Sequence, residues 1–419
     1  MRFLMLFLGL WSGVFVAYLF YPFSRYSLLK EGMSFWLFYI IIHLIAVSIG
    51  FINLYLCYFR ALSRRGHSSQ RIVMFKIKIL RRYYMGLLLV GGLFTFVKTA
   101  IVVHHFGSPS SLHYLYTVRI AYLQGGLYFP AVVEFFSRYP LLSASVLAAF
   151  IYWVEGKLWP AMCTLLFLTV NNLSFGSRGD IVLSMILYMA TLLVLAYVSN
   201  NSIANILLNR RLLFLMISVL AIVIVVFIGR HGYNVRNAID DSILYFAGNI
   251  PATVYVLHMA YDEQLSPMGP IMSIGGILRF ATELLKDLGI SMPVLPVDFG
   301  YVPVYSDLDY GVNTYTYVAY LVGDWGLVGS LIASYLIGFI VAYSLIRAKA
   351  GGSVFWLVTS IIMVTLLLTT PLYLASKLIS WWMTWLVSYL VSAGCVSVEK
   401  TLEKGYNPIR AGKELTSRA

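Results

Sequence analysis

The sequence predicts an all-α polytopic membrane protein, a chain of apolar helices that cross a lipid bilayer many times. Of its 419 residues, 60% are hydrophobic and only 11% are charged, whereas soluble domains carry about 25% charged residues. Long runs such as "LLFLMISVLAIVIVVFIG" (212–229) are apolar on every side, without the in-and-out alternation of a membrane β-strand. Helices are therefore the expected spanning element, because a helix satisfies its own backbone hydrogen bonds in lipid.

A spanning helix needs about 17 to 25 predominantly apolar residues. By this measure the chain has ten predicted spans: residues 2–23, 34–57, 83–103, 127–152, 158–176, 181–198, 212–229, 314–346, 354–373 and 378–397. The first span has too long an apolar run for a signal peptide and lacks a small-residue cleavage site, so we expect it to be retained. The predicted organisation is spans one to seven (1–229), a large extracytoplasmic loop (230–313), spans eight to ten (314–397) and a cytoplasmic tail (398–419).

The distribution of lysine and arginine predicts the orientation, because cytoplasmic loops carry an excess of them. The loop after the second span is strongly basic, with Arg60, Arg64, Arg65, Arg71, Lys76, Lys78, Arg81 and Arg82. We therefore place this loop and both termini in the cytoplasm. The net charge of +13 then reflects topology, and no nucleic-acid partner is expected. Cys57, Cys163 and Cys395 offer neither a disulfide framework nor a metal-ligand spacing.

The external loop 230–313 has several parts. Its apolar piece (242–261) is expected to lie on or dip into the membrane, and "GGILRFATELLKDLG" (275–289) has the spacing of an amphipathic helix. The loop and the neighbouring turns carry cations that run against the positive-inside bias. Guanidinium groups suit phosphate because each planar fork donates two parallel hydrogen bonds. The candidate diphosphate-binding residues are Arg119, Arg178, Arg230, Arg236, Arg279 and Lys286.

Each of these cations has a simpler interpretation. Arg178 and Asp180 lie in the turn between spans five and six, where Asp180 is also a reasonable helix cap. Arg279 and Glu283 are four residues apart and could form a helix-surface pair. For the set as a whole we favour an anion site, with a lipid-linked phosphate or diphosphate as its ligand.

If a group is transferred from such a diphosphate to an acceptor hydroxyl, a base is also needed to take up the hydroxyl proton. His231 is the first choice because imidazole titrates near neutral pH, and a boundary histidine that only forms hydrogen bonds is the alternative. The other catalytic candidates are Asp180, Glu283 and Asp324. Asp324 lies inside the eighth span, where a carboxylate is a functional hypothesis by default, although it could pair with Lys98 or with backbone instead.

Three further patterns have both a structural and a functional interpretation. Glu134 and Arg138 are four residues apart in the fourth span and are expected to form a structural pair with each other. Asp307 and Asp309 have the Asp-x-Asp spacing of some metal sites, but a solvated turn is favoured, and no metal or cofactor is expected. Aromatic and amide side chains would serve a carbohydrate groove or an interfacial aromatic belt. The candidate sugar-binding residues are Tyr233, Tyr310, Asn313 and Tyr315.

The segments "SFGSRGDIVLSMIL" (174–187) and "GVNTYTYVAYLVGDWGLVGSLIASYLIGFIVAYSL" (311–345), with the single large external loop, resemble the Wzy-type O-antigen or oligosaccharide repeat-unit polymerases. The resemblance implies a metal-independent membrane glycosyltransferase of the GT-C type in a bacterial inner membrane, with its active site on the periplasmic face. Such an enzyme transfers a growing glycan from undecaprenyl diphosphate to the terminal sugar of an undecaprenyl-diphosphate-linked repeat unit. The resemblance carries over to Arg178, Arg230 and Arg279, and to 313–316 and 323–326.

The partners that this resemblance implies are the lipid-linked oligosaccharide donor and acceptor, membrane lipid, a chain-length regulator protein and a flippase. Two other functions stay open at this point. An O-antigen ligase performs the same chemistry on a different acceptor. A flippase or transporter of lipid-linked sugars should line a central cavity with polar residues, which spans one, seven and nine almost lack.

Overall fold

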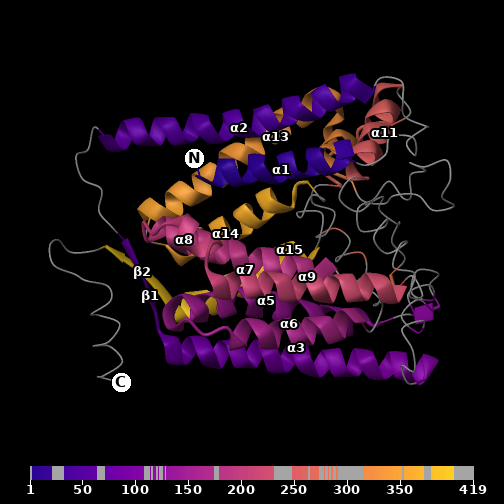
Figure 1. Ribbon diagram of the computed structural model, residues 1–419, viewed down its shortest axis with the longest axis vertical. Helices are drawn as coiled ribbons and strands as arrows, with labels where there is room; N and C mark the ends of the chain where they lie inside the picture. Colours follow the sequence, from indigo (N-terminus) through magenta and orange to yellow (C-terminus); the bar gives the residue numbers. More distant parts are fainter. Residues whose placement is uncertain are drawn as a thin grey trace.

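The protein is a bundle of long helices, and successive helices run in opposite directions (Figure 1). The computed structural model describes residues 2–20, 33–63, 71–107, 114, 117–118, 121, 126–127, 129–173, 179–230, 248–262, 265–272, 278, 282, 285, 289–290, 315–351, 353–371 and 379–400, with the backbone alone at several helix ends. The elements are α1 (Arg2–Phe20), α2 (Met33–Ser63), β1 (Arg71–Phe75), α3 (Ile77–Phe106), α5 (Ala131–Glu155), α6 (Trp159–Leu173), α7 (Gly179–Val198), α8 (Ile203–Leu207), α9 (Arg210–Arg230), α11 (Asn249–Tyr261), α13 (Tyr317–Gly351), α14 (Val354–Thr369), α15 (Ile379–Cys395) and β2 (Val396–Lys400).

The predicted class, a mainly helical multi-pass membrane protein, is confirmed. Six helices are long and apolar enough to cross a membrane: α1, α2, α3, α5, α7 and α13. Every one of the ten predicted spans overlaps a helix. However, α6, α14 and α15 have only 15, 16 and 17 residues, which at about 1.5 Å per residue is shorter than a hydrocarbon core of about 30 Å. Ten complete crossings therefore stay a prediction.

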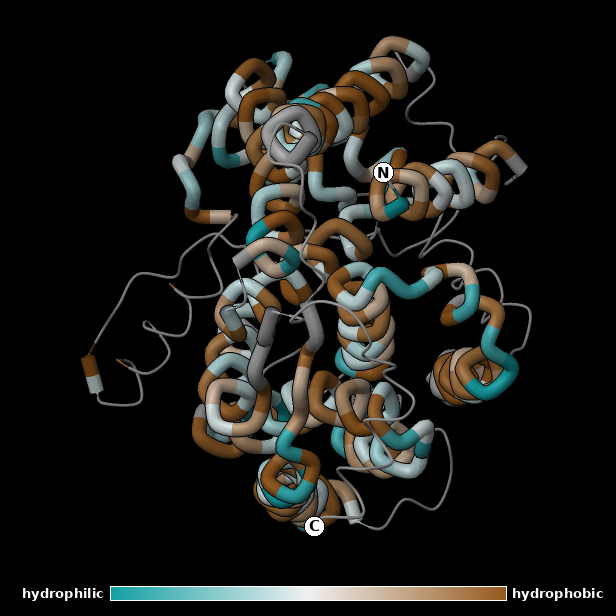
Figure 2. Tube along the Cα trace, turned by 90° about the vertical axis from the view of Figure 1, so that its left-hand side faces the viewer, coloured by the Kyte–Doolittle hydropathy of each residue, from teal (hydrophilic) through white to brown (hydrophobic). Residues whose placement is uncertain are grey.

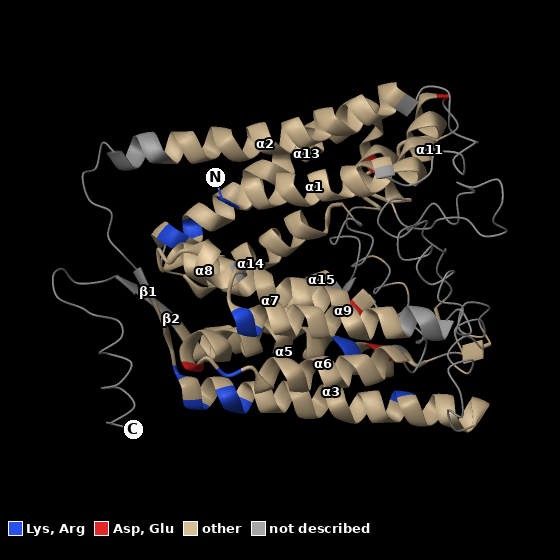
Figure 3. Cartoon of the chain, viewed as in Figure 1, with Lys and Arg blue, Asp and Glu red and all other residues tan. Residues whose placement is uncertain are grey.

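Among the described residues, the two ends of the bundle differ in charge (Figure 3). At one end, which we call the basic pole, α1 and α3 begin and α13 ends, and β2 lies there too (Figure 1). Its described cations are Arg2, Lys76, Lys78, Arg81, Arg82, Lys157, Arg210, Arg211, Arg347 and Lys349. At the other end, the far pole, α5 and α7 begin and α3 and α9 end. Figure 2 looks along the helices from the basic pole and shows brown, hydrophobic segments interspersed with white and teal ones.

A short β-sheet at the basic pole was not predicted. β1 and β2 pair antiparallel, from Arg71 opposite Lys400 to Phe75 opposite Val396, and the Lys76 amide donates to the Cys395 carbonyl at 2.8 Å. The last predicted span (378–397) therefore ends as a helix at Cys395 and continues as a strand. The sheet joins the basic loop after α2 to the C-terminal segment.

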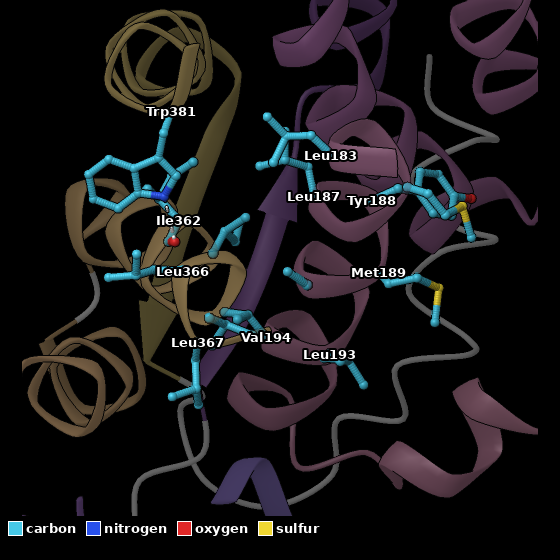
Figure 4. Close-up of a cluster of buried hydrophobic side chains, with 14 of the residues drawn as sticks. Leu183, Leu187, Tyr188, Met189, Leu193, Val194, Ile362, Leu366, Leu367 and Trp381 are labelled. Atoms are coloured by element: carbon cyan, nitrogen blue, oxygen red, sulfur yellow. Dashed lines mark hydrogen bonds between the residues drawn. The ribbon is translucent and has the colours of Figure 1, made fainter. Parts of the chain in front are cut away.

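The core centres on α7. In this helix 83% of the apolar stretch is buried, whereas the figure for α13 is 28%. Leu183, Leu187 and Val194 of α7 pack against Leu366 and Leu367 of α14 (Figure 4). Beside them the Trp381 indole of α15 donates to the Ile362 carbonyl at 3.2 Å (Figure 4). α7 is thus apolar on every side because protein surrounds it. The outer helices are apolar on every side because they face lipid.

Helices α2 and α13 cross very closely. A Cβ atom on Gly50 would lie 2.1 Å from the Tyr335 carbonyl oxygen, and one on Gly338 would lie 1.9 Å from that of Val47. Only glycine permits this approach, as in many membrane helix pairs. Buried polar groups share the same seam, where His43 Nδ1 lies 2.7 Å from Ser334 Oγ.

Candidate functional site

Four charged side chains meet between helices near the far pole. They are Lys98 of α3, Glu134 and Arg138 of α5, and Asp180 of α7, and we call them the charged cluster. A charge inside the membrane costs about 2.5–3.5 kcal/mol at the bilayer centre, and such groups mark functional sites by default. The charged cluster is therefore the first candidate for the functional site.

The pairing within the charged cluster differs from the expectation that Glu134 and Arg138 bind each other. Lys98 Nζ lies 2.9 Å from Glu134 Oε1. Arg138 Nε lies 2.6 Å from Asp180 Oδ1, and a terminal guanidinium nitrogen lies 2.5 Å from the same oxygen. The expected pair was wrong because α5 packs between α3 and α7, so that each of its charges neutralises a buried charge on a different helix.

Exposure divides the charged cluster into an inner and an outer part. The side chains of Lys98 and Asp180 are 0% and 1% exposed, whereas those of Glu134 and Arg138 are 27% and 28% exposed. The Lys98 ammonium also lies over the Phe129 ring, 4.6 Å from its centroid. The two α5 residues are thus the members that a ligand could reach, while the inner residues hold them in place.

Buried polar atoms that lack partners within the described part of the chain lie at the end of α6 and at the start of α7. Asp180 Oδ2 has no hydrogen-bond partner among the described residues. At the end of α6, both amide atoms of Asn171 and the Oδ1 atom of Asn172 also lack partners within the described part of the chain, although Asn172 donates to the Leu168 carbonyl at 2.7 Å. An unsatisfied buried polar group costs about 1–3 kcal/mol and needs an explanation. A polar ligand, or the residues between α6 and α7, would supply the missing hydrogen-bond partners.

Asp180 therefore has a different setting from a simple helix cap. It lies in the first turn of α7, where a carboxylate interacts favourably with the helix dipole. Its carboxylate is engaged by Arg138 of another helix. The role that this geometry favours for Asp180 is to orient the Arg138 guanidinium.

Asp324 is tied to backbone, the second of the two partners considered for it. Its Oδ1 accepts the Met272 amide at 2.6 Å, and its carbonyl accepts the Gly269 amide at 2.9 Å. Two residues later α13 is kinked at Gly326, with φ 68°, in the region that favours glycine. Asp324 thus fastens the loop segment 265–272 to the kink, which is a positioning role.

Tyr315, a predicted sugar contact, is fully buried. Its ring packs edge-to-face against Tyr320, with centroids 6.0 Å apart. The adjacent Thr316 and Thr253 of α11 bind each other through their hydroxyls at 3.0 Å. Tyr315 therefore packs inside the protein and helps to hold the start of α13 in place.

The other predicted site residues lie at the end of α9 or outside the described residues. Arg230 is the last residue of α9, so its backbone lies at the far pole together with the start of α7 (Figure 1); its side chain is not described. The following residues lie outside the described residues: Arg119, Arg178, His231, Tyr233, Arg236, Arg279, Glu283, Lys286, Asp307, Asp309, Tyr310 and Asn313. Convergence of the arginines on one diphosphate stays a prediction.

Sequence reasoning missed Asn171 and Asn172, and it did not bring Lys98 into the site. A signal was present, because an Asn-Asn pair at the end of an apolar run and a lysine within another run are both unusual. Comparison of the chain with protein-family models, with curated proteins and with solved structures finds no match in any of the three. The resemblance to repeat-unit polymerases thus rests on the quoted segments alone.

Proposed function

We propose that the chain is a bacterial inner-membrane glycosyltransferase that polymerises lipid-linked oligosaccharide repeat units, with its active site at the far pole. The observation that carries the proposal is the charged cluster, where buried Lys98 and Asp180 hold the partly exposed Glu134 and Arg138. Asp180 of the cluster is two residues from Arg178 in the sequence, and the end of α9 lies at the same pole (Figure 1). In this proposal the basic pole faces the cytoplasm and the far pole faces the periplasm.

The reaction follows from the chemistry of the donor. The acceptor hydroxyl oxygen forms a bond to the anomeric carbon of the donor sugar, and the bond from that carbon to the diphosphate oxygen breaks. Undecaprenyl diphosphate leaves with the bonding electron pair, and the hydroxyl proton passes to a base. The main task of the protein is to stabilise the negative charge that develops on the leaving group, which preorganised cations do well at a water-poor interface.

The residues divide between these tasks. Arg138 joins Arg178, Arg230 and Arg279 as a candidate cation for the diphosphate, because Asp180 fixes its orientation. His231, which follows Arg230 at the end of α9, remains the first choice for the base. Glu134 is an alternative base, since its carboxylate is partly exposed and lies about one helical turn from Arg138 on α5.

Matched ion pairs on the same two helices test the proposal. Lys98 and Glu134 join α3 to α5 near the far pole, and Arg81 and Glu155 join them at the basic pole. The assay is polymerisation of purified lipid-linked repeat units, read as a glycan ladder on a gel. We expect Glu134→Gln to lose the ladder and Glu155→Gln to keep it. Equal ladders from both variants would show that the charged cluster is not part of the active site.

A carrier of lipid-linked sugars is a second candidate, because ion pairs shared between buried helices also occur along transport pathways. Purified protein in vesicles separates the two functions, since an enzyme extends glycan without moving the labelled lipid between leaflets. The glycan of a deletion strain separates a polymerase from a ligase. Surface glycan reduced to one repeat unit indicates a polymerase, and loss of all surface glycan indicates a ligase or flippase.

A further inference from the structure

A second site lies at the basic pole, on the opposite side of the bundle from the charged cluster. A cavity of about 290 Å³ opens between the start of α1, the second half of α2, the turn after α7 and the end of α13. Its lining includes Arg2, Phe51, Tyr197, Asn200 and Lys349. Its size is close to the lower end of the range for small-ligand pockets, about 300–1,000 Å³.

The lining combines two cations with apolar and aromatic walls. Arg2 and Lys349 both line the cavity, and no carboxylate occurs among its described lining residues. Lys98, Arg138 and Arg81, by contrast, each have an acidic partner. Two like charges that share a pocket without an acid make an anion the natural ligand.

Lys349 is also held in position. Its Nζ donates to Asn200 Oδ1 at 2.6 Å and lies 4.8 Å from the centroid of the Tyr197 ring. Asn200 adopts φ 57°, a left-handed conformation that few residues other than glycine accept. The turn after α7 thus points an amide at the ammonium group, and this fixes the charge at the mouth of the cavity.

We propose that this pocket binds the phosphate group of an anionic phospholipid from the leaflet at the basic pole. The cations and Asn200 would take the phosphate oxygens, and Phe51, Tyr55 and Phe3 would pack against the glycerol and the first acyl carbons. Basic pockets between membrane helices on the cytoplasmic side suit such headgroups. The proposal does not depend on the function of the far pole.

The test uses the full chain, purified in a neutral detergent, and native mass spectrometry with phosphatidylglycerol or phosphatidylcholine of the same acyl chains. We expect phosphatidylglycerol to bind and phosphatidylcholine to bind far more weakly. Each charge near the membrane surface contributes about 1 kcal/mol, so Lys349→Gln should weaken binding about fivefold and Arg2→Gln with Lys349→Gln about thirtyfold. The matched control is Arg347→Gln, because Arg347 stacks on Tyr343 and Trp356 near the same end of α13 and does not line the cavity.

Inorganic phosphate, added at millimolar concentration as a competitor, separates the two sources of the phosphate group. If it leaves the lipid in place, the lipid assignment holds; if it displaces the lipid, the pocket takes free phosphate and the lipid assignment is overturned. Equal binding by the double variant and by the Arg347→Gln control also overturns the proposal. An unchanged helical circular dichroism spectrum shows that each variant is folded.

Discussion

Arg138 and Asp180 form an ion pair across two helices, with two guanidinium nitrogens at 2.6 and 2.5 Å from one carboxylate oxygen. Asp180 is 1% exposed and Arg138 is 28% exposed, so the pair extends from the interior of the bundle to its accessible edge. A guanidinium that is held in this way is preorganised for a second anion, because its remaining N–H groups already have a fixed direction.

The first prediction separates the structural role of this pair from its functional role. Removal of one partner from a buried pair costs about 3–5 kcal/mol, whereas replacement of both by apolar residues is often neutral. Asp180→Leu alone should therefore lower the thermal unfolding midpoint in detergent, and Asp180→Leu with Arg138→Met should restore it. We expect neither variant to produce a glycan ladder. A stable double variant that still polymerises would show that the pair serves the fold alone.

The sequence predicted the helices far better than the contacts between them. Each predicted span overlaps a helix, because apolar length determines where a chain can cross lipid. The ion pairs join residues 36 and 42 positions apart, and no local pattern encodes such a distance. The spacing of Glu134 and Arg138 even favoured the wrong pair, since the pattern of a single helix indicates only i, i+3 and i, i+4 neighbours as partners.

The contacts within the candidate site were likewise not predictable from local sequence patterns. The charged residues of "SRGD" (177–180) stood out because they interrupt an apolar run, but the partner of Asp180 depends on how α5 packs beside α7. The strands β1 and β2 lie more than 300 residues apart in the chain, and the hydropathy of either segment alone does not predict their pairing. Non-local packing therefore determines which of the candidate charges meet.

The second prediction concerns Asp324, which accepts the Met272 amide at 2.6 Å. An asparagine keeps an acceptor oxygen at this position but cannot take up a proton as a carboxylate does. Asp324→Asn should therefore keep most of the ladder activity, and Asp324→Ala should lose stability by about 1–3 kcal/mol because a buried amide is left unpaired. Loss of activity in Asp324→Asn without loss of stability would restore Asp324 as a base.

The third prediction tests the close crossing of α2 and α13. Gly338→Ala would place a Cβ atom 1.9 Å from the Val47 carbonyl oxygen, so the helices must separate. We expect a loss of about 1–3 kcal/mol, typical of overpacking, measured as a lower unfolding midpoint. The control is Gly86→Ala in α3, where a Cβ atom meets nothing within 4 Å. An equal midpoint in the two variants would contradict the crossing.

The fourth prediction concerns topology. Pro267 lies in the segment that is fastened to the kink of α13 at the far pole, where its Cγ atom would be 3.3 Å from a Cβ atom on Gly326. Alkaline phosphatase fused near Pro267 should be active, because that enzyme folds only outside the cytoplasm, and a fusion after Lys400 should be inactive. The reverse pattern would invert the bundle and place the charged cluster at the cytoplasmic face.

The last prediction concerns the arginines that are expected to bind diphosphate. If catalysis depends on stabilisation of a departing lipid diphosphate, Arg178→Lys and Arg230→Lys should reduce polymerisation strongly, because a lysine cannot reproduce the two-pronged donation of the guanidinium. His231→Ala should lose the contribution of a base, about 10²- to 10⁴-fold. Arg82→Lys at the basic pole is the matched control and should leave the ladder unchanged. EDTA should have no effect on the wild-type protein, and an EDTA block that Mg²⁺ reverses would instead assign a metal role to Asp307 and Asp309. Full activity of both Arg178→Lys and Arg230→Lys would exclude these two bidentate contacts from the mechanism.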